Sequence, residues 1–281
     1  MLGLVRPVLR HADVLRLRIG QLGELRVELP QLQARDLLIE MLGQGVRETL
    51  KTMLDWLQKR GAKVIEIDTD GLYFVPPPKT DPKTLERGLQ EALPKGVDVE
   101  IDGQFPAMFS YKMKNYALLD NDGKLHITGS ALRSRGLEKF QRQFLEEMLT
   151  LALKGDAKKV PQLYEDYCQK IERGQFPIEM LSKTETLQDT LDAYQQKIAK
   201  SARNRSAPYE LALKSGRAYQ PGDQITYYVT GDGKRVSMYD NCKLAVDFNP
   251  ARRDENIDYY LDKLKVLYKK FAPLLASAQT A

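Results

Sequence analysis

The stretch that decides the fold is IEIDTDGLYFV, residues 65–75. Within it, Asp68 and Asp70 lie one residue apart inside an otherwise apolar, β-branched and aromatic run. An unpaired buried charge is costly, so a turn, a cation or solvent must compensate these carboxylates. The Asp-Gly pair formed by Asp70 and Gly71 lies between two apolar runs, which is a strong hairpin signal. The sequence therefore predicts two short strands joined by a DTDG turn.

The turn by itself explains Asp70, because Gly71 accepts a positive φ and Asp tolerates one. It does not explain Asp68, which adds a second negative charge close by. Two carboxylates that converge at a hairpin tip are typical of a magnesium site, because Mg²⁺ takes one or two protein carboxylates and leaves its other positions to phosphates and water. From the spacing alone, a plain turn and a metal site both remain open.

Composition limits the class of protein. The chain has 281 residues, 42% of them hydrophobic, which is enough for one large or two ordinary domains. No apolar run approaches the roughly 18 residues that span a bilayer, and the amino terminus lacks a secretory pattern, so we expect no membrane partner. We expect a cytoplasmic protein, associated with the nucleoid in a prokaryote. Cysteine and histidine are too few and too scattered for a zinc site or a disulfide framework.

The sequence predicts a chain of three parts. Residues 1–45 form an atypical amino-terminal segment of unknown role, since residues 1–46 contain six arginines but no lysine or aromatic residue. From Val46 to residue 135 we expect an α+β arrangement, and from Gly136 a mostly helical one. In the middle part, helical spacing starts at Val46 and a second helix follows at residues 81–94. Its expected strands are KVIEI, LYFV, VDVEID, FSYKMKNYALLD and KLHITG.

The order of these segments resembles the carboxy-terminal part of family B DNA polymerases. The matching pieces are a helix, IEIDTDGLYFV, SYKMKNYALL, ITGSALRSR and a helical region containing PGDQITYYV. The resemblance implies a partial palm domain over residues 46–135, with an antiparallel sheet and packed helices. It implies a mostly helical thumb domain over residues 136–281. The implied activity is that of a DNA-directed DNA polymerase, which uses primer-template DNA and deoxynucleoside triphosphates.

The DTD segment looks like the third polymerase motif of that family. Carried over, Asp68 and Asp70 are catalytic residues and magnesium ligands, with Asp70 the stronger candidate for direct ligation. Thr69 and Gly71 then shape the turn. In the family, two magnesium ions activate the primer 3′ hydroxyl and stabilise the charge on the pyrophosphate leaving group.

The segment KMKNY resembles the lysine and tyrosine motif with which the family contacts the duplex near the primer terminus. Lys114 and Tyr116 match that motif, whereas Met113 and Asn115 stand where many members carry further lysines. Lys112 is a partial substitute. Alternation along a strand would simply place Lys112, Lys114 and Tyr116 on one solvent face, and that interpretation also remains open.

Two further basic segments are candidate DNA contacts. In TGSALRSR, Arg133 and Arg135 resemble the glycine-led arginine segment at the junction of palm and thumb, although Gly136 replaces the acidic residue that follows it in the family. Residues 197–217 contain six cations and a single acid, Glu210. The resemblance assigns this stretch to the face that grips the product duplex, but an ordinary solvated face explains the charge equally well. Its candidate contacts are Lys197, Lys200, Arg203 and Arg205.

Motifs that a family B polymerase needs do not occur in these 281 residues: a first palm motif with its metal-binding aspartate, and a fingers helix with its lysine. We therefore expect these residues to supply only part of a two-ion magnesium site and to be inactive alone. One interpretation is the small chain of a split enzyme that requires a complementing polymerase chain. A second is a non-catalytic DNA-binding remnant or module of a truncated polymerase. A third, a metal-dependent phosphohydrolase, lacks further carboxylates or histidines at useful spacing.

Overall fold

The computed structural model describes residues 9–19, 32–68, 71–134, 136–201 and 205–276. Its chain divides into two compact units. The sheet unit comprises the described residues of 1–133, 149–157 and 274–281, and the helix-rich unit comprises those of 134–148 and 158–273. Among the described residues, no helix is both long and apolar enough to cross a membrane.

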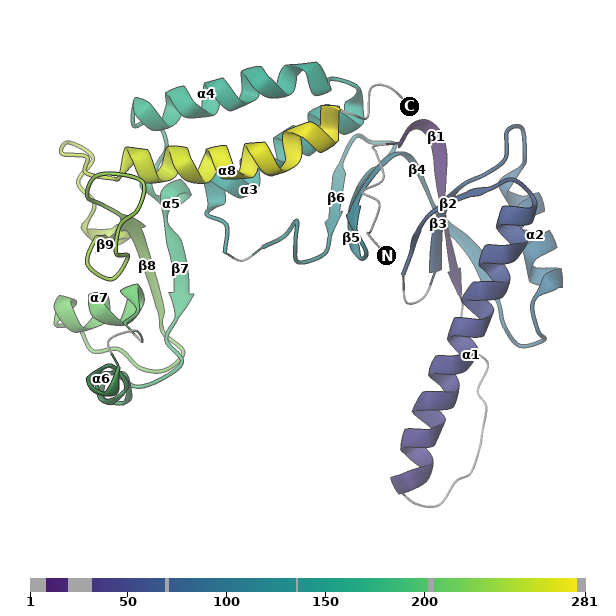
Figure 1. The fold of residues 1–281 in the computed structure, drawn as a ribbon, viewed down its shortest axis with the longest axis horizontal. Coiled ribbons are helices and arrows are strands. Elements are labelled where there is room, and N and C mark those ends of the chain that lie inside the picture. The colour runs from purple at the N-terminus through teal and green to yellow at the C-terminus, as the bar shows by residue number, and fades with distance from the viewer. Residues whose placement is uncertain (1–8, 20–31, 69–70, 135, 202–204, 277–281) are drawn as a thin grey trace. The chain divides into compact units, whose positions relative to one another are not determined.

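The first unit is built on a six-stranded antiparallel sheet with the strand order β2-β3-β1-β4-β5-β6 (Figure 1). Its first six elements repeat a strand-helix-strand arrangement in which another strand lies between the two connected ones, as in split βαβ folds. The elements are β1 Leu9–Ile19, α1 Leu32–Lys59, β2 Lys63–Ile67, β3 Gly71–Val75, α2 Pro82–Ala92, β4 Val99–Lys112, β5 Asn115–Leu119 and β6 Leu125–Thr128.

The main core of the sheet unit lies between the sheet and the helices α1 and α2. Met53 and Leu57 of α1 and Leu89 of α2 are fully buried against Leu72 and Phe74 of β3. The apolar residues of α1 recur at helical spacing, and the alternate residues of β3 face them, so one stripe of each element is removed from water. The start of α2 is fixed locally, because the Asp81 side chain accepts a hydrogen bond from the Thr84 amide.

A second apolar cluster joins β2 and β3 to β4 and β5. It contains Ile65, Tyr73, Met108, Tyr116 and Leu118. Since β2 and β5 are separated by three strands in the sheet order, these residues meet only because the sheet curls. The curl brings the β2–β3 hairpin to the turn between β4 and β5.

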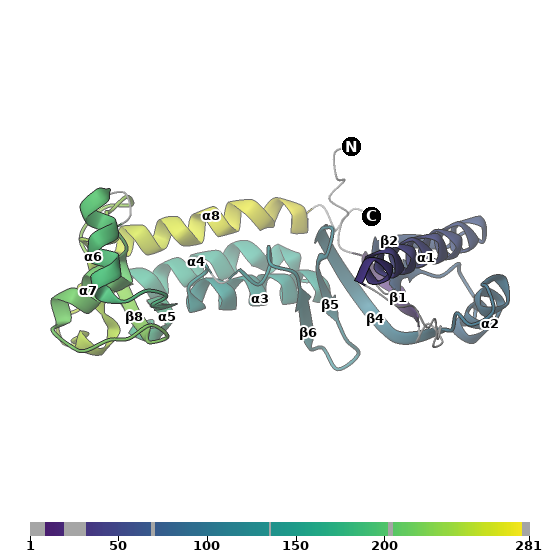
Figure 2. The same ribbon diagram turned by 90° about the horizontal axis from the view of Figure 1, so that it is seen from below.

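The second unit consists of helices and a three-stranded antiparallel sheet of order β7-β8-β9. Helices α3, α4 and α8 run side by side (Figures 1 and 2), joined by ring contacts such as the stacked pair Tyr164 and Tyr268, whose centroids are 4.3 Å apart. The elements are α3 Lys139–Lys154, α4 Val160–Glu172, α5 Ile178–Leu181, β7 Lys183–Thr186, α6 Leu191–Lys200, α7 Ala207–Ser215, β8 Gln224–Val229, β9 Cys242–Leu244 and α8 Ile257–Ala276, with 3₁₀ helices at Ala157–Lys159 and Ala245–Asp247.

The mixed α+β fold predicted from the sequence is confirmed, but the amino-terminal part differs from the expectation. Residues 9–19, in which no motif was found, form β1, an interior strand between β3 and β4. Helix α1 begins at Leu32 and not at Val46, and it continues through Gly43 and Gly45. The predicted division after residue 45 therefore falls inside a helix.

The strand prediction for FSYKMKNYALLD is wrong in its middle. Strand β4 runs without interruption from Val99 to Lys112, and β5 begins at Asn115. Between them Lys114 has φ = 59°, a left-handed conformation that belongs to a turn and not to a strand. Lys112 and Lys114 are therefore not alternate residues of one strand face.

Close backbone packing at Gly129 generates a stability prediction. Its φ is +95°, and a Cβ there would lie 2.2 Å from the Lys114 carbonyl oxygen. We expect Gly129→Ala to lower the free energy of unfolding by about 3 kcal/mol or more, because strain and overlap add. Urea unfolding followed by the fluorescence of Trp56, the single tryptophan, reports on this unit.

Gly96→Ala is the matched control, because Gly96 has φ = +91° but nothing lies within 4 Å of the added methyl group. Gly96→Ala should lower the free energy of unfolding only by the backbone strain, roughly 1–2 kcal/mol. Equal losses in the two variants would show that the contact with the β4–β5 turn is not tight.

Candidate functional site

The carboxylate of Asp68 lies at the end of β2, where the β2–β3 hairpin turns. The Asp68 amide donates to the Gly71 carbonyl oxygen at 2.9 Å, which closes the hairpin as the Asp-Gly signal predicted. The side chain is 24% exposed, with one oxygen 3.4 Å from the Lys114 ammonium nitrogen. Its other oxygen accepts a hydrogen bond of 3.3 Å from the Tyr116 hydroxyl. Thr69 and Asp70 lie outside the described residues.

The β4–β5 turn presents basic side chains beside a buried tyrosine. Lys112 and Lys114 are exposed, whereas Tyr116 is buried with its ring centroid 5.0 Å from that of Tyr73. The two hydroxyl oxygens are 3.2 Å apart, and because Tyr116 donates to Asp68, Tyr73 is the donor to Tyr116. Burial, with the hydrogen bond to Tyr116, raises the pKa of Tyr73, so this hydroxyl keeps its proton at neutral pH.

The glycine-led arginine segment lies against the same turn. The Ala131 amide donates to the Asn115 side-chain oxygen at 2.7 Å, and the Arg133 amide donates to the Gly129 carbonyl oxygen at 3.0 Å. Arg133 is exposed, and Arg135 lies outside the described residues. The structure thus brings Asp68, the first residue of DTDG, together with KMKNY and TGSALR at one edge of the sheet unit.

The surroundings of Asp68 limit how a metal could be held. Across the described part of the chain, no group of three or more His, Cys, Asp or Glu side chains could hold a metal ion. Asp68 contacts an ammonium group, that of Lys114, and a hydroxyl, that of Tyr116. In the strand register, Arg18 of β1 is opposite Gly71. Asp68 fits as one oxygen ligand of a hard cation, but the described residues do not complete a two-ion site.

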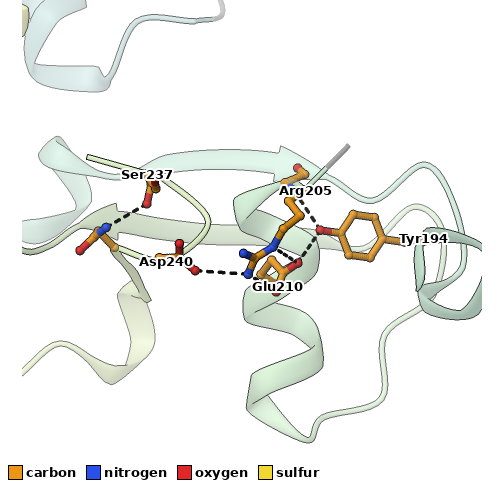
Figure 3. Close-up of polar contacts among 7 residues, drawn as sticks. Tyr194, Arg205, Glu210, Ser237 and Asp240 are labelled. Carbon is orange, nitrogen blue, oxygen red and sulfur yellow. Dashed lines mark hydrogen bonds and ion pairs between the residues drawn. The ribbon is translucent and has the colours of Figure 1, made fainter. Parts of the chain in front are cut away.

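In the helix-rich unit, Arg205 is held by acidic partners (Figure 3). Its guanidinium donates to both carboxylate oxygens of Glu210, at 3.1 and 3.2 Å, and to Asp240 at 3.2 Å. Glu210 also accepts a 2.8 Å hydrogen bond from the Tyr194 hydroxyl. The Arg205 guanidinium, helped by Tyr194, holds the pKa of Glu210 below its usual value.

The other basic residues of this stretch differ in their surroundings. Lys197 pairs with Asp189 at 2.7 Å, which raises the pKa of Lys197, and Lys200 is exposed. Arg203 lies outside the described residues. Charge counting along residues 197–217 missed Asp189 and Asp240 because both lie outside that window. That Lys197, Lys200 and Arg205 contact DNA stays a prediction.

The sequence relatives and the solved structure that resemble this chain are all DNA polymerases. No protein-family model matches the chain. It is 25% identical over 213 residues to a DNA polymerase of Thermococcus kodakarensis and 27% identical over 218 residues to one of Pyrococcus horikoshii, each match covering 73% of the chain. The solved family B DNA polymerase of Pyrobaculum calidifontis superposes on 98% of the chain with a TM-score of 0.63 at 16% identity. The resemblance to family B DNA polymerases is confirmed.

The shared region is a limited part of these polymerases. The chain spans 12% of the Thermococcus kodakarensis polymerase, 17% of the Pyrococcus horikoshii polymerase and 46% of the solved Pyrobaculum calidifontis chain. The family B resemblance therefore covers one region of a larger enzyme, and it supports the mixed α+β fold with its curled antiparallel sheet.

The contacts of Glu210 predict a pH dependence of stability. Since folding lowers the pKa of Glu210 below its usual 4.5, the ionised side chain stabilises the fold above that pH, and this contribution disappears as the pH falls through the folded value. We expect Glu210→Gln to lower the free energy of unfolding at pH 7, with a gap to the parent that narrows below pH 4.5. Urea unfolding followed by circular dichroism measures both.

The exposed Glu165 provides the control, since its carboxylate is solvated. Glu165→Gln should leave the unfolding free energy close to that of the parent at either pH. A gap between parent and Glu210→Gln that stays constant with pH would contradict the role assigned to the Arg205 pair.

Proposed function

We propose that this chain is the palm and thumb part of a family B DNA-directed DNA polymerase and that it binds primer-template DNA. The observation that carries the proposal is the convergence of Asp68, the KMKNY turn and the TGSALR segment at one edge of the sheet unit. In this assignment residues 46–135 are the partial palm and residues 136–281 the thumb. The sequence similarity to archaeal DNA polymerases supports the same assignment.

Contacts to DNA are assigned to the exposed cations around the β4–β5 turn. Lys114 is 54% exposed, and Lys112 and Arg133 are exposed as well. Such side chains contact phosphates and carry no sequence preference, which suits an enzyme that must copy any template. On the thumb, Lys200 is an exposed candidate, whereas Arg205 would have to leave Glu210 to contact a phosphate.

For nucleotidyl transfer, Asp68 and Asp70 would hold magnesium together with substrate phosphates. The bound ions would supply activation of the primer 3′ hydroxyl and stabilisation of the leaving group. Because the described residues do not complete a two-ion site, we propose that other residues, such as those of a complementing polymerase chain, supply the remaining ligands and the contacts to the deoxynucleoside triphosphate.

A second candidate function is a non-catalytic DNA-binding module. The observation that favours it is the ion pair between Asp68 and Lys114. Positive charge beside the DTDG turn disfavours a cation there. In this alternative the same edge of the sheet unit still contacts phosphates.

The proposed DNA contact predicts a salt effect. Replacing Lys114 by methionine should weaken binding to primer-template DNA and lower the slope of log affinity against log salt by about one, because one phosphate contact is lost. Fluorescence anisotropy of a labelled primer-template over a potassium chloride series measures both. Lys83→Met, at an exposed position on α2, is the control and should behave like the parent. Identical slopes for the two variants would remove Lys114 from the DNA contact.

The proposed chemistry predicts primer extension only in a mixture. The chain should extend a primer when it is combined with a family B polymerase fragment that carries the first palm motif and the fingers helix, and not by itself. Asp70→Ala should abolish this extension and leave DNA binding nearly unchanged, whereas Asp122→Ala, at an exposed turn, should change neither.

Three outcomes of that experiment separate the candidates. Extension only in the mixture supports shared nucleotidyl transfer. No extension despite retained DNA binding supports the non-catalytic module. Extension by the chain alone would show that these 281 residues already hold a complete site.

A further inference from the structure

Glu66 is a buried charged residue that belongs to none of the motifs described above. This residue lies on β2, two positions before Asp68, and is only 7% exposed. One carboxylate oxygen accepts a 2.9 Å hydrogen bond from the Ser110 hydroxyl of β4. The other accepts a 2.8 Å hydrogen bond from the backbone amide of Lys114. A buried carboxylate is tolerated only when donors satisfy it, and here β4 and the β4–β5 turn provide them.

The hydrogen bond from the Lys114 amide to Glu66 is made by the residue of the turn that has a left-handed backbone conformation. Lys114 has φ = 59°, which a residue with a long side chain adopts only when its surroundings impose it. The carboxylate of Glu66 holds the amide of this residue. Asn115 braces the other side of the turn, accepting the Ala131 amide and donating to the Met113 carbonyl oxygen.

The backbone conformation at Lys114 decides where the functional side chains lie. With this amide held, the Lys114 ammonium reaches Asp68 at 3.4 Å, and Tyr116 reaches the same carboxylate at 3.3 Å. Glu66 thus contacts the backbone of this turn, and Asp68 contacts the side chains of Lys114 and Tyr116. Loss of the Glu66 contact would release the left-handed residue and move the Lys114 side chain.

We infer that Glu66 is a positioning residue that holds the KMKNY turn in the conformation that presents Lys114 to the phosphates of duplex DNA. This inference rests on the proposed function, since it assumes that Lys114 contacts DNA. Glu66 acts through Lys114 and does not itself touch the nucleic acid.

The test compares three substitutions of Glu66 in the full chain. Glu66→Ala removes the acceptor. Glu66→Asp keeps the charge but shortens the reach to the Lys114 amide. Glu66→Gln keeps the reach, since its amide oxygen can accept from Lys114 and its amide nitrogen can donate to the Ser110 hydroxyl. The measurements are binding of labelled primer-template DNA over a salt series and hydrogen exchange of the peptide that contains Lys114.

The alanine and aspartate variants should bind DNA more weakly, with a salt slope lower by about one, as for Lys114→Met. Their Lys114 amide should lose protection from exchange. Glu66→Gln should restore affinity, slope and protection, and a double variant lacking both Glu66 and Lys114 should bind no more weakly than Lys114→Met. Ser110→Ala is the matched control, because it removes a hydrogen bond from the same carboxylate and leaves the Lys114 contact, so its DNA binding should equal that of the parent.

Parent-like binding by the aspartate and alanine variants, with a clear effect of Lys114→Met, would overturn the positioning role and leave the proposed DNA contact standing. Parent-like binding by Lys114→Met would overturn the DNA contact itself, and the inference with it. If Glu66→Ala does not fold, as judged by circular dichroism, the comparison of the aspartate and glutamine variants decides the question.

Discussion

The candidate site depends on the need of one buried carboxylate for hydrogen-bond donors. Glu66 lies on β2 but finds its donors at Ser110 and Lys114, 44 and 48 residues further along the chain. Meeting that need requires the sheet to curl, so that the end of β4 approaches β2. Once it does, the Tyr73 and Tyr116 rings contact each other at a tilted angle, and Asp68 contacts the same turn. The polar contacts and the apolar cluster of this edge therefore stabilise one another, because each depends on the same curl.

The basic stretch of the helix-rich unit shows why charge alone is a weak guide to nucleic-acid binding. Arg205 contacts Glu210, Asp240 and the Tyr239 ring, and these contacts connect helix α7 to the loop before β9. A guanidinium used in this way stabilises the fold and has less freedom to contact phosphates. Lys197 is paired in the same way with Asp189, whereas Lys200 is exposed and stays a candidate for a phosphate contact. Ion pairs within the protein thus distinguish the cations of this basic segment that stabilise the fold from those that are candidate DNA contacts.

The sheet unit combines the fold of a solved family B DNA polymerase with an ammonium group beside Asp68. Family B polymerases share its fold, and the three motif segments meet at one edge. Yet Asp68 contacts the Lys114 ammonium group and the Tyr116 hydroxyl. The ammonium group of Lys114 favours contact with the phosphates of DNA. The surroundings of Asp68 suit magnesium only when further anionic groups, from substrate or from other residues, join the site.

The sequence by itself determined the features that depend on local spacing: the helices with apolar residues every three or four positions, the hairpin closed at Asp68 and Gly71, and the α+β class. These follow from neighbouring residues, because backbone periodicity and turn chemistry act over a few positions. Only the tertiary structure decided that residues 9–19 form an interior strand, that KMKNY turns at Lys114, and that Glu66 and Arg205 have the partners described. Those outcomes depend on contacts between residues far apart in the chain, and such contacts exist only once the sheet has curled and the helices have packed.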